Sequence, residues 1–291
     1  MLAQFLQFLF SGLTTGSTYA LAALGFTLIY NASHVINFAQ GEFIMLGGML
    51  AVYFSTAGLP LPVALALAIA LPALVGLALE KLAIEPARNA EPVALIIITI
   101  GASLVIRGVI QVWLGKGTFS LAPFSGDAPL HIGGATLMPQ SLWVLGVSAL
   151  VVGGLWYFFN RTLYGKAMLA TACNRTAARL VGIHTEGVLL VSFAMSAAIG
   201  ALGGVLLTPI TLTSYDVGIM LGLKGFVAAV LGGLGNGLGA VVGGLLVGVI
   251  EAFGAGYVSS AYKDAIPFVL ILIILFVKPS GLMGRASTDR V

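Results

Sequence analysis

Residues 226–253, FVAAVLGGLGNGLGAVVGGLLVGVIEAF, form an apolar run that closely spaced glycines interrupt near its middle. As a single helix this run would be roughly 42 Å long at 1.5 Å per residue, whereas the hydrocarbon core of a bilayer is only about 30 Å thick. We therefore predict two shorter membrane segments joined by a break. The glycines at the break are Gly232, Gly233, Gly235, Gly237 and Gly239.

The rest of the chain has the same apolar character. Of its 291 residues 59% are hydrophobic and only 8% are charged, against about 45–50% and about 25% in soluble domains. This composition excludes a soluble globule and predicts an all-α, polytopic membrane protein with about eight to nine spans, some of them glycine-broken or re-entrant. The remaining apolar stretches are 5–30, 36–54, 60–79, 93–114, 142–159, 188–207 and 265–277.

Lysine and arginine indicate the orientation, because short cytoplasmic loops retain them. They gather at 81–88, at 161–179 and in a tail that contains Lys278, Arg285 and Arg290. If all three groups lie inside, neighbouring groups are separated by an even number of crossings. The run 226–253 then either crosses twice, or crosses once with a re-entrant partner while a neighbouring span is miscounted. We expect the N-terminus outside and a single membrane domain over residues 1–291.

Signatures of catalysis and of nucleic-acid binding are nearly absent. The sequence has no HExxH, GxSxG or Walker A motif, and its three histidines are too dispersed to indicate a metal site. A formal GxGxxA match at 235–240 lacks the preceding strand that a dinucleotide site needs. The net charge of +3 rests on few residues and indicates no nucleic-acid surface. We expect no enzyme activity, no metal and no cofactor.

A polar interruption, HVINFAQGEF at 34–43, separates two apolar stretches. Its candidate residues are Asn37, Gln40, Gly41 and Glu42. A carboxylate at membrane depth is costly unless it is paired or hydrated, so Glu42 is a functional candidate; the alternative is a carboxylate stabilised at a helix start. Glu251 raises the same question. Arg107 is a plausible partner for one of the two.

The glycine break is a second candidate for the translocation path. Unwound backbone at membrane depth is tolerated where it is buried in protein or lines an aqueous cavity, so Gly232, Gly233, Gly235 and Asn236 are assigned to the path. A simple turn between helices is the alternative. Glycine pairs four residues apart elsewhere, such as Gly12/Gly16 and Gly244/Gly248, indicate close helix packing.

The segment 165–182 is rich in alanine, lacks proline and has glycine at both ends, which predicts a short helix on the inner side. Arg175 and Arg179 lie four residues apart on one face. Like charges at this spacing repel weakly, so an acidic partner would stabilise them. The alternative is an ordinary positive inner loop.

Four separated motifs together resemble the permease subunits of bacterial branched-chain amino acid ABC importers. They are HVINFAQGEF at 34–43, GKAMLATACNRTAARLVGI at 165–183, GFVAAVLGGLGNGLGAVVGGLLVGVIE at 225–251 and KPSGLMG at 278–284. The resemblance extends from residue 10 to residue 284. It implies an inner-membrane subunit that imports leucine, isoleucine and valine.

The resemblance also implies partners: a homologous second permease, two cytoplasmic ATPase subunits and a periplasmic amino-acid-binding protein, in a lipid membrane. The segment 165–182 corresponds to the family's coupling segment, which docks into the ATPase. The family usually has an arginine after Met168, whereas Leu169 stands here, which puts one ATPase contact in doubt. The residues assigned to coupling are Gly165, Lys166, Met168, Arg175, Arg179 and Gly182.

Other transport classes remain open at this level. A secondary transporter would use Glu42 or Glu251 as its coupling carboxylate, and would need no ATPase. Replacing Glu42 by Gln would abolish ion dependence in such a carrier. A permease of a related urea or amide ABC importer, and a passive channel for a small neutral solute, are the further alternatives.

Overall fold

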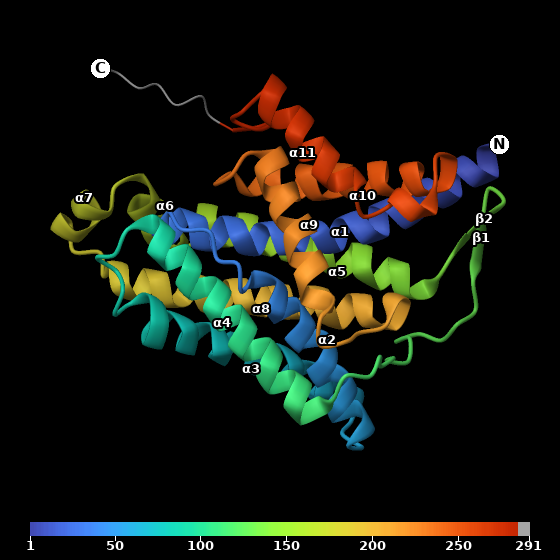
Figure 1. Cartoon of the computed structure of the whole chain (residues 1–291), viewed down its shortest axis with the longest axis horizontal. Coiled ribbons are helices and arrows are strands. Elements are labelled where there is room, and N and C mark those ends of the chain that lie inside the picture. The colour runs from blue at the N-terminus through green and yellow to red at the C-terminus, as the bar shows by residue number, and fades with distance from the viewer. Residues whose placement is uncertain (285–291) are drawn as a thin grey trace.

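The computed structural model describes residues 1–284, so Arg285 and Arg290 lie outside the described residues. Within this range the chain is built almost entirely from helices (Figure 1). They are α1 (Leu2–Ser33), α2 (Gln40–Thr56), α3 (Leu61–Leu79), α4 (Pro92–Leu114), α5 (Pro139–Arg161), α6 (Leu163–Cys173), α7 (Arg175–Leu180), α8 (Thr185–Thr211), α9 (Val217–Gly232), α10 (Gly237–Tyr257) and α11 (Ile266–Val277). Strands β1 (Leu130–Ile132) and β2 (Ala135–Leu137) form a small antiparallel hairpin.

Among residues 1–284, six helices are long and apolar enough to cross a membrane. These are α1, α4, α5, α8, α10 and α3 extended by a π-helical turn at Glu80–Ile84. Helices α2, α9 and α11 are shorter. The prediction of an all-α polytopic protein with broken segments is therefore confirmed, and the run 226–253 is divided between α9 and α10 at the glycines, as predicted.

Hydrogen bonds identify which segments share each end of the molecule. Gln7, near the N-terminus, exchanges two hydrogen bonds with the backbone of Thr136 in β2. The N-terminus thus lies on the side of the 115–138 connection, which the charge pattern assigns to the outside. At the opposite end Asn31 donates to the carbonyl of Gly235 at 3.0 Å. The α9–α10 turn is therefore on the inner side.

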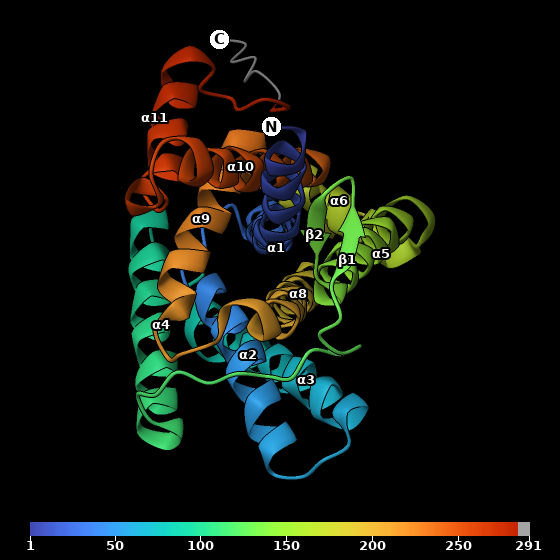
Figure 2. The same cartoon turned by 90° about the vertical axis from the view of Figure 1, so that its right-hand side faces the viewer.

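Helix α1 runs through the middle of the bundle, and α8, α9 and α10 surround it (Figure 2). Its glycine pair packs against the glycine pair of α10. A Cβ atom on Gly12 would lie 2.7 Å from Cα of Val249, and one on Gly16 would lie 2.9 Å from Cα of Leu245. Both glycines are therefore required by the close approach of the two backbones.

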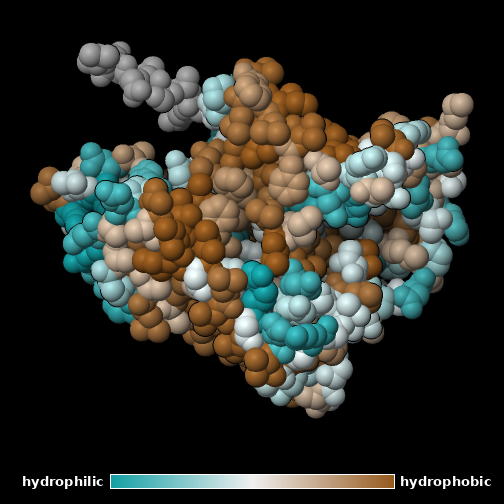
Figure 3. Space-filling view, in the orientation of Figure 1, coloured by the Kyte–Doolittle hydropathy of each residue, from teal (hydrophilic) through white to brown (hydrophobic). Residues whose placement is uncertain are grey.

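Apolar side chains cover the outer faces of the peripheral helices. On α4 the residues Leu104, Val105 and Val112 are exposed, and on α11 Phe276 is exposed. In the space-filling view hydrophobic residues cover the surface formed by these two helices (Figure 3). Such surfaces suit contact with lipid or with another membrane subunit.

The inner segment differs from the prediction of one helix over 165–182. It consists of two helices, α6 and α7, which meet at Asn174. Asn174 adopts an extended conformation, and its side chain accepts a hydrogen bond from the N–H of Ala177 at 2.9 Å. This N-cap starts a new helix with a changed axis, because asparagine side chains compete with the backbone for local hydrogen bonds.

Candidate functional site

The first candidate site is the break between α1 and α2. Helix α1 ends at Ser33, and His34 takes a left-handed conformation with φ of 56°. Gln40, the first residue of α2, packs beside Gly25 of α1. Gly25 lies about 12 Å from the inner end of α1 at 1.5 Å per residue. Helix α2 therefore begins inside the membrane, with its positive dipole end at that depth.

Helix α8 holds the break from one side. The Ser196 hydroxyl lies 2.6 Å from Oε1 of Gln40 and 2.8 Å from the carbonyl oxygen of Gly25. The Gln40 amide donates in turn to the carbonyl of Ser196 at 3.2 Å. Gln40 and Ser196 are fully buried. These bonds satisfy polar groups that would otherwise be left without water.

Helix α4 holds the break from another side. Thr99 accepts a hydrogen bond from the N–H of Phe38 at 3.1 Å. Ser103 donates to Oε1 of Glu42 at 2.9 Å, and Nη2 of Arg107 donates to the same oxygen at 3.0 Å. Glu42 is therefore the partner of Arg107, a choice between Glu42 and Glu251 that the sequence left open. Its other oxygen, Oε2, is buried and has no hydrogen-bond partner among residues 1–284.

The other candidates near the break have local roles. Asn37 is buried and accepts a hydrogen bond from the N–H of Ala39 at 3.1 Å, which shapes the turn into α2. Gly41 faces α9, where a Cβ atom would lie 3.0 Å from Cα of Gly222. The first turn of α2 thus crosses α9 at backbone contact distance.

The glycine break between α9 and α10 lies elsewhere, at the inner end. Gly233 and Gly235 have φ of 107° and 92°, which glycine adopts without strain. Asn236 accepts a hydrogen bond from the N–H of Gly239 and donates to the carbonyl of Met283 at 2.8 Å. Gly232 accepts from the N–H of Met283 at 3.0 Å. The structure therefore brings the two groups of candidate path residues to different depths.

A second cluster of charged residues surrounds Glu251. The sequence identified Glu251 as a candidate, but it did not identify the cluster's other members. Lys224 of α9 is buried and lies 2.9 Å from Glu251 and 2.6 Å from Asp264. The Tyr19 hydroxyl donates to Glu251 at 3.2 Å, and Lys263 lies 3.6 Å from the same carboxylate. The hydrogen bond from Lys224 lowers the pKa of Asp264, which lies in the outer α10–α11 connection. A lone lysine inside an apolar stretch was the signal in the sequence.

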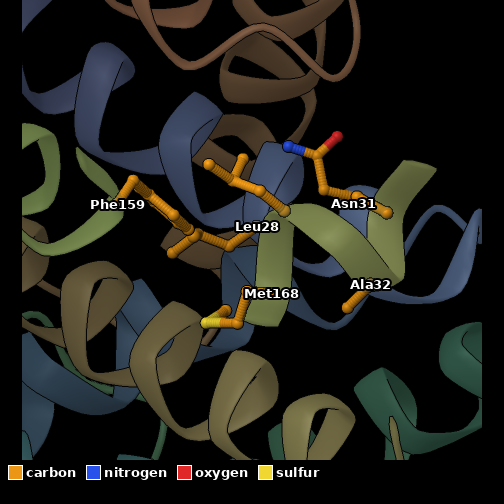
Figure 4. A pocket seen from close by; sticks show the side chains of 7 residues that line it. Leu28, Asn31, Ala32, Phe159 and Met168 are labelled. Carbon is orange, nitrogen blue, oxygen red and sulfur yellow. The ribbon is translucent and has the colours of Figure 1, made fainter. Parts of the chain in front are cut away.

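The inner helix pair lies against α1 and α5. Gly165 is buried, where a Cβ atom would lie 2.7 Å from Cα of Phe159. Met168 is buried, and with Leu28 and Asn31 of α1 and Phe159 it lines a small pocket (Figure 4). Lys166 is exposed. These contacts fix α6 beneath the inner end of α1.

Helix α7 carries the two arginines. Arg179 donates to the hydroxyl of Thr185 at 2.8 Å and lies 3.9 Å from Glu186, so this chain itself supplies an acidic neighbour, whereas the sequence pointed to one from a partner. Arg175 is half-buried, and burial together with the nearby Arg179 cation lowers its pKa. Gly182 has φ of 87° and makes the turn that follows α7. Leu180 and Val181 at the end of α7 are strongly exposed.

Residues 8–275 match a family model described as branched-chain amino acid transport system / permease component. The chain belongs to this family. The permease is 34% identical to the high-affinity branched-chain amino acid transport system permease protein LivH of Salmonella typhimurium, over 99% of this chain and 98% of the relative. It is 33% identical to BraD of Pseudomonas aeruginosa, a permease protein described in the same words, over 99% of this chain and 98% of BraD.

Two further similarities are more distant. The ribose import permease protein RbsC of Escherichia coli is 28% identical to the permease, over 92% of this chain and 84% of RbsC. A solved structure described as PsaBC from Streptococcus pneumoniae in complex with Fab matches 96% of the permease and 97% of the other chain. Its TM-score is 0.52 at 13% identity. This last similarity concerns the fold alone.

Proposed function

We propose that this permease is the membrane subunit of an ABC importer that carries leucine, isoleucine and valine across the bacterial inner membrane. The observation that carries the proposal is the full-length similarity, at 33–34% identity, to permeases of high-affinity branched-chain amino acid transport. The helical architecture, with six helices long enough to span a membrane, supports it. We infer that residues 1–291 act as one permease domain.

The partners in this proposal are a homologous second permease, two ATPase subunits and a periplasmic binding protein. The exposed inner helix pair supports the ATPase contact. Leu163, Leu180 and Val181 present exposed apolar side chains at the inner end, and exposed apolar groups mark interaction surfaces. We infer that α6 and α7 dock into the ATPase through this surface, and that ATP hydrolysis takes place in the partner.

The break between α1 and α2, at residues 34–39, is the element that we propose changes shape during translocation. It is unwound backbone at membrane depth, held by side-chain hydrogen bonds from α4 and α8 rather than by continuous helix. A segment held in this way exchanges between discrete arrangements more readily than a regular helix. In this proposal Asn37, Gln40, Gly41 and Glu42 border the path, and Gly232, Gly233, Gly235 and Asn236 border its inner end.

An ion-coupled carrier is disfavoured by the pairing of both membrane carboxylates. Glu42 lies 3.0 Å from Arg107, and Glu251 lies 2.9 Å from Lys224. A coupling carboxylate has to release and rebind a cation from solution during each cycle, whereas these two are neutralised by cations of the chain itself.

Substrate competition tests the cargo. Proteoliposomes containing the permease with its second permease and ATPases, with binding protein outside and ATP inside, are given labelled leucine. We expect excess isoleucine and valine to suppress uptake, and ribose and urea to leave it unchanged. Suppression by ribose or urea would contradict the proposed cargo and favour a sugar or amide importer.

A further inference from the structure

One ion pair on the inner side joins parts of the chain that are far apart in sequence. Nη1 of Arg88, in the connection between α3 and α4, lies 2.7 Å from Oε1 of Glu186, in the first turn of α8. Arg179 of α7 lies 3.9 Å from the same oxygen. A single carboxylate therefore joins the first turn of α8, the connection between α3 and α4, and the inner helix pair. We call the first contact the Arg88–Glu186 bridge.

The bridge lies at the inner ends of the two helices that hold the break inside the membrane: Glu186 is in the first turn of α8, and α4 begins at Pro92, shortly after Arg88. Helix α4 supplies Thr99, Ser103 and Arg107, which bond Phe38 and Glu42. Helix α8 supplies Ser196, which bonds Gln40. The break is thus hydrogen-bonded from two sides by α4 and α8, and the Arg88–Glu186 bridge connects the inner ends of these two helices.

Helix α4 depends on few other contacts for its position. Only Leu95, Thr99, Ser103 and Ile110 are buried along its described length. Helix α8, in contrast, packs deeply against α1, α2 and α3. A tie between the inner ends therefore has more effect on α4 than on α8.

The bridge itself adds little to stability. The side chains of Arg88 and Glu186 are 46% and 42% exposed, and ion pairs in contact with water contribute little to folding. A nearby pair, Lys81 and Glu85, has similar exposure and a distance of 2.7 Å, but both residues lie one helical turn apart in the same segment. It joins no separate elements, and it serves as the matched control.

We propose that the Arg88–Glu186 bridge transmits movement of α6 and α7 to the intramembrane break, by making α4 and α8 move together. Arg88 and Glu186 are positioning residues in this account and contact no substrate. The inference rests on the proposed function, because it requires an ATPase that displaces α6 and α7. It adds the route by which that displacement reaches the membrane.

The test is a double-mutant cycle in reconstituted transporter. The variants are Arg88→Gln, Glu186→Gln, the two combined, and Arg88→Lys, with Lys81→Gln/Glu85→Gln as control. Leucine uptake and ATP hydrolysis stimulated by the binding protein are measured on the same proteoliposomes. Size-exclusion profiles of the purified complexes show that each variant assembles.

We expect either glutamine variant to lower uptake about tenfold, within the usual range of coupling between sites, while ATP hydrolysis stays near the wild-type rate. The combined variant is expected to be no worse than Glu186→Gln alone, because that single variant already removes the contact with Arg88. Arg88→Lys and the control pair are expected to keep uptake.

Three results would overturn the inference: uptake near wild type in both glutamine variants, losses that multiply in the combined variant, or ATP hydrolysis that falls in step with uptake. Failure of the proposed function would look different. In that case the wild-type complex itself would show no ATP-dependent uptake, and the inference would fall with it.

Discussion

Glu42 and Glu251, the two carboxylates that the sequence singled out, each have a counter-charge that only the fold supplies. Glu42 and Arg107 are 65 residues apart in sequence, and Lys224 and Glu251 are 27 apart. The sequence showed which carboxylates needed explaining, because the cost of an unpaired charge in a membrane depends on residue type and depth alone. The choice of partner depends on how helices pack, so Lys224 and Asp264 were not found from the sequence.

The Glu42–Arg107 pair gives a prediction about single residues. Glu42→Gln leaves the Arg107 guanidinium partly buried without a counter-charge, and we expect it to cost about 3 kcal/mol. Arg107→Gln is expected to cost a similar amount, whereas the combined variant should regain at least half of the loss, because no uncompensated charge remains. Thermal unfolding of the purified permease in detergent measures the effect. Costs that simply add in the combined variant would contradict a direct pair.

At the scale of elements, local signals in the sequence predicted most of the helices and the break in the run 226–253. Turn geometry requires the glycines there, as at Gly233 and Gly235, which have positive φ. A requirement of this kind can be recognised from the local sequence alone. The division of 165–182 into α6 and α7 also had a local signal, because Asn174 is a residue that commonly caps a helix. The segment has no proline, and for that reason it was predicted as one continuous helix. The placement of the two breaks at different depths depends on tertiary contacts such as Gln40 with Ser196. No periodicity in the sequence encodes it.

Helix packing between α1 and α10 gives a prediction at the same scale. In Gly244→Ala the added methyl group meets the backbone of Ala20, and neither helix can move away without losing contacts along its length. We expect a loss of about 1–3 kcal/mol. Gly101→Ala is the control, because a Cβ atom there has nothing within 4 Å. Equal thermal stability of the two variants would show that the glycine contact is not required.

For the whole molecule, the inner and outer ends differ in their charged residues and in the elements that they expose. The inner end gathers Arg88, Arg179 and Glu186 around the exposed pair α6 and α7, while the outer end carries the β1–β2 hairpin against the N-terminus. The family comparison and the charge pattern agree on a multi-pass membrane protein. This polarity is what an importer needs, since substrate enters at one end and energy is supplied at the other.

Cysteine labelling checks this orientation. Cys173, at the end of α6, is exposed and free. In intact spheroplasts an impermeant maleimide is expected to leave it unlabelled until the membrane is permeabilised. In a Cys173→Ser background, Leu2→Cys is expected to label before permeabilisation, because Leu2 is 70% exposed and lies near the outer hairpin. The reverse pattern would invert the topology.

The most direct measurement of the central claim is leucine uptake into proteoliposomes with ATP present or absent inside, and with ionophores that collapse proton and sodium gradients. The complete system contains the second permease, the ATPases and external binding protein; one further arm omits the binding protein, and another contains this chain alone. The account predicts uptake that requires ATP and binding protein and that ionophores leave unchanged. Uptake by this chain alone, driven by an ion gradient and abolished by ionophores, would contradict it.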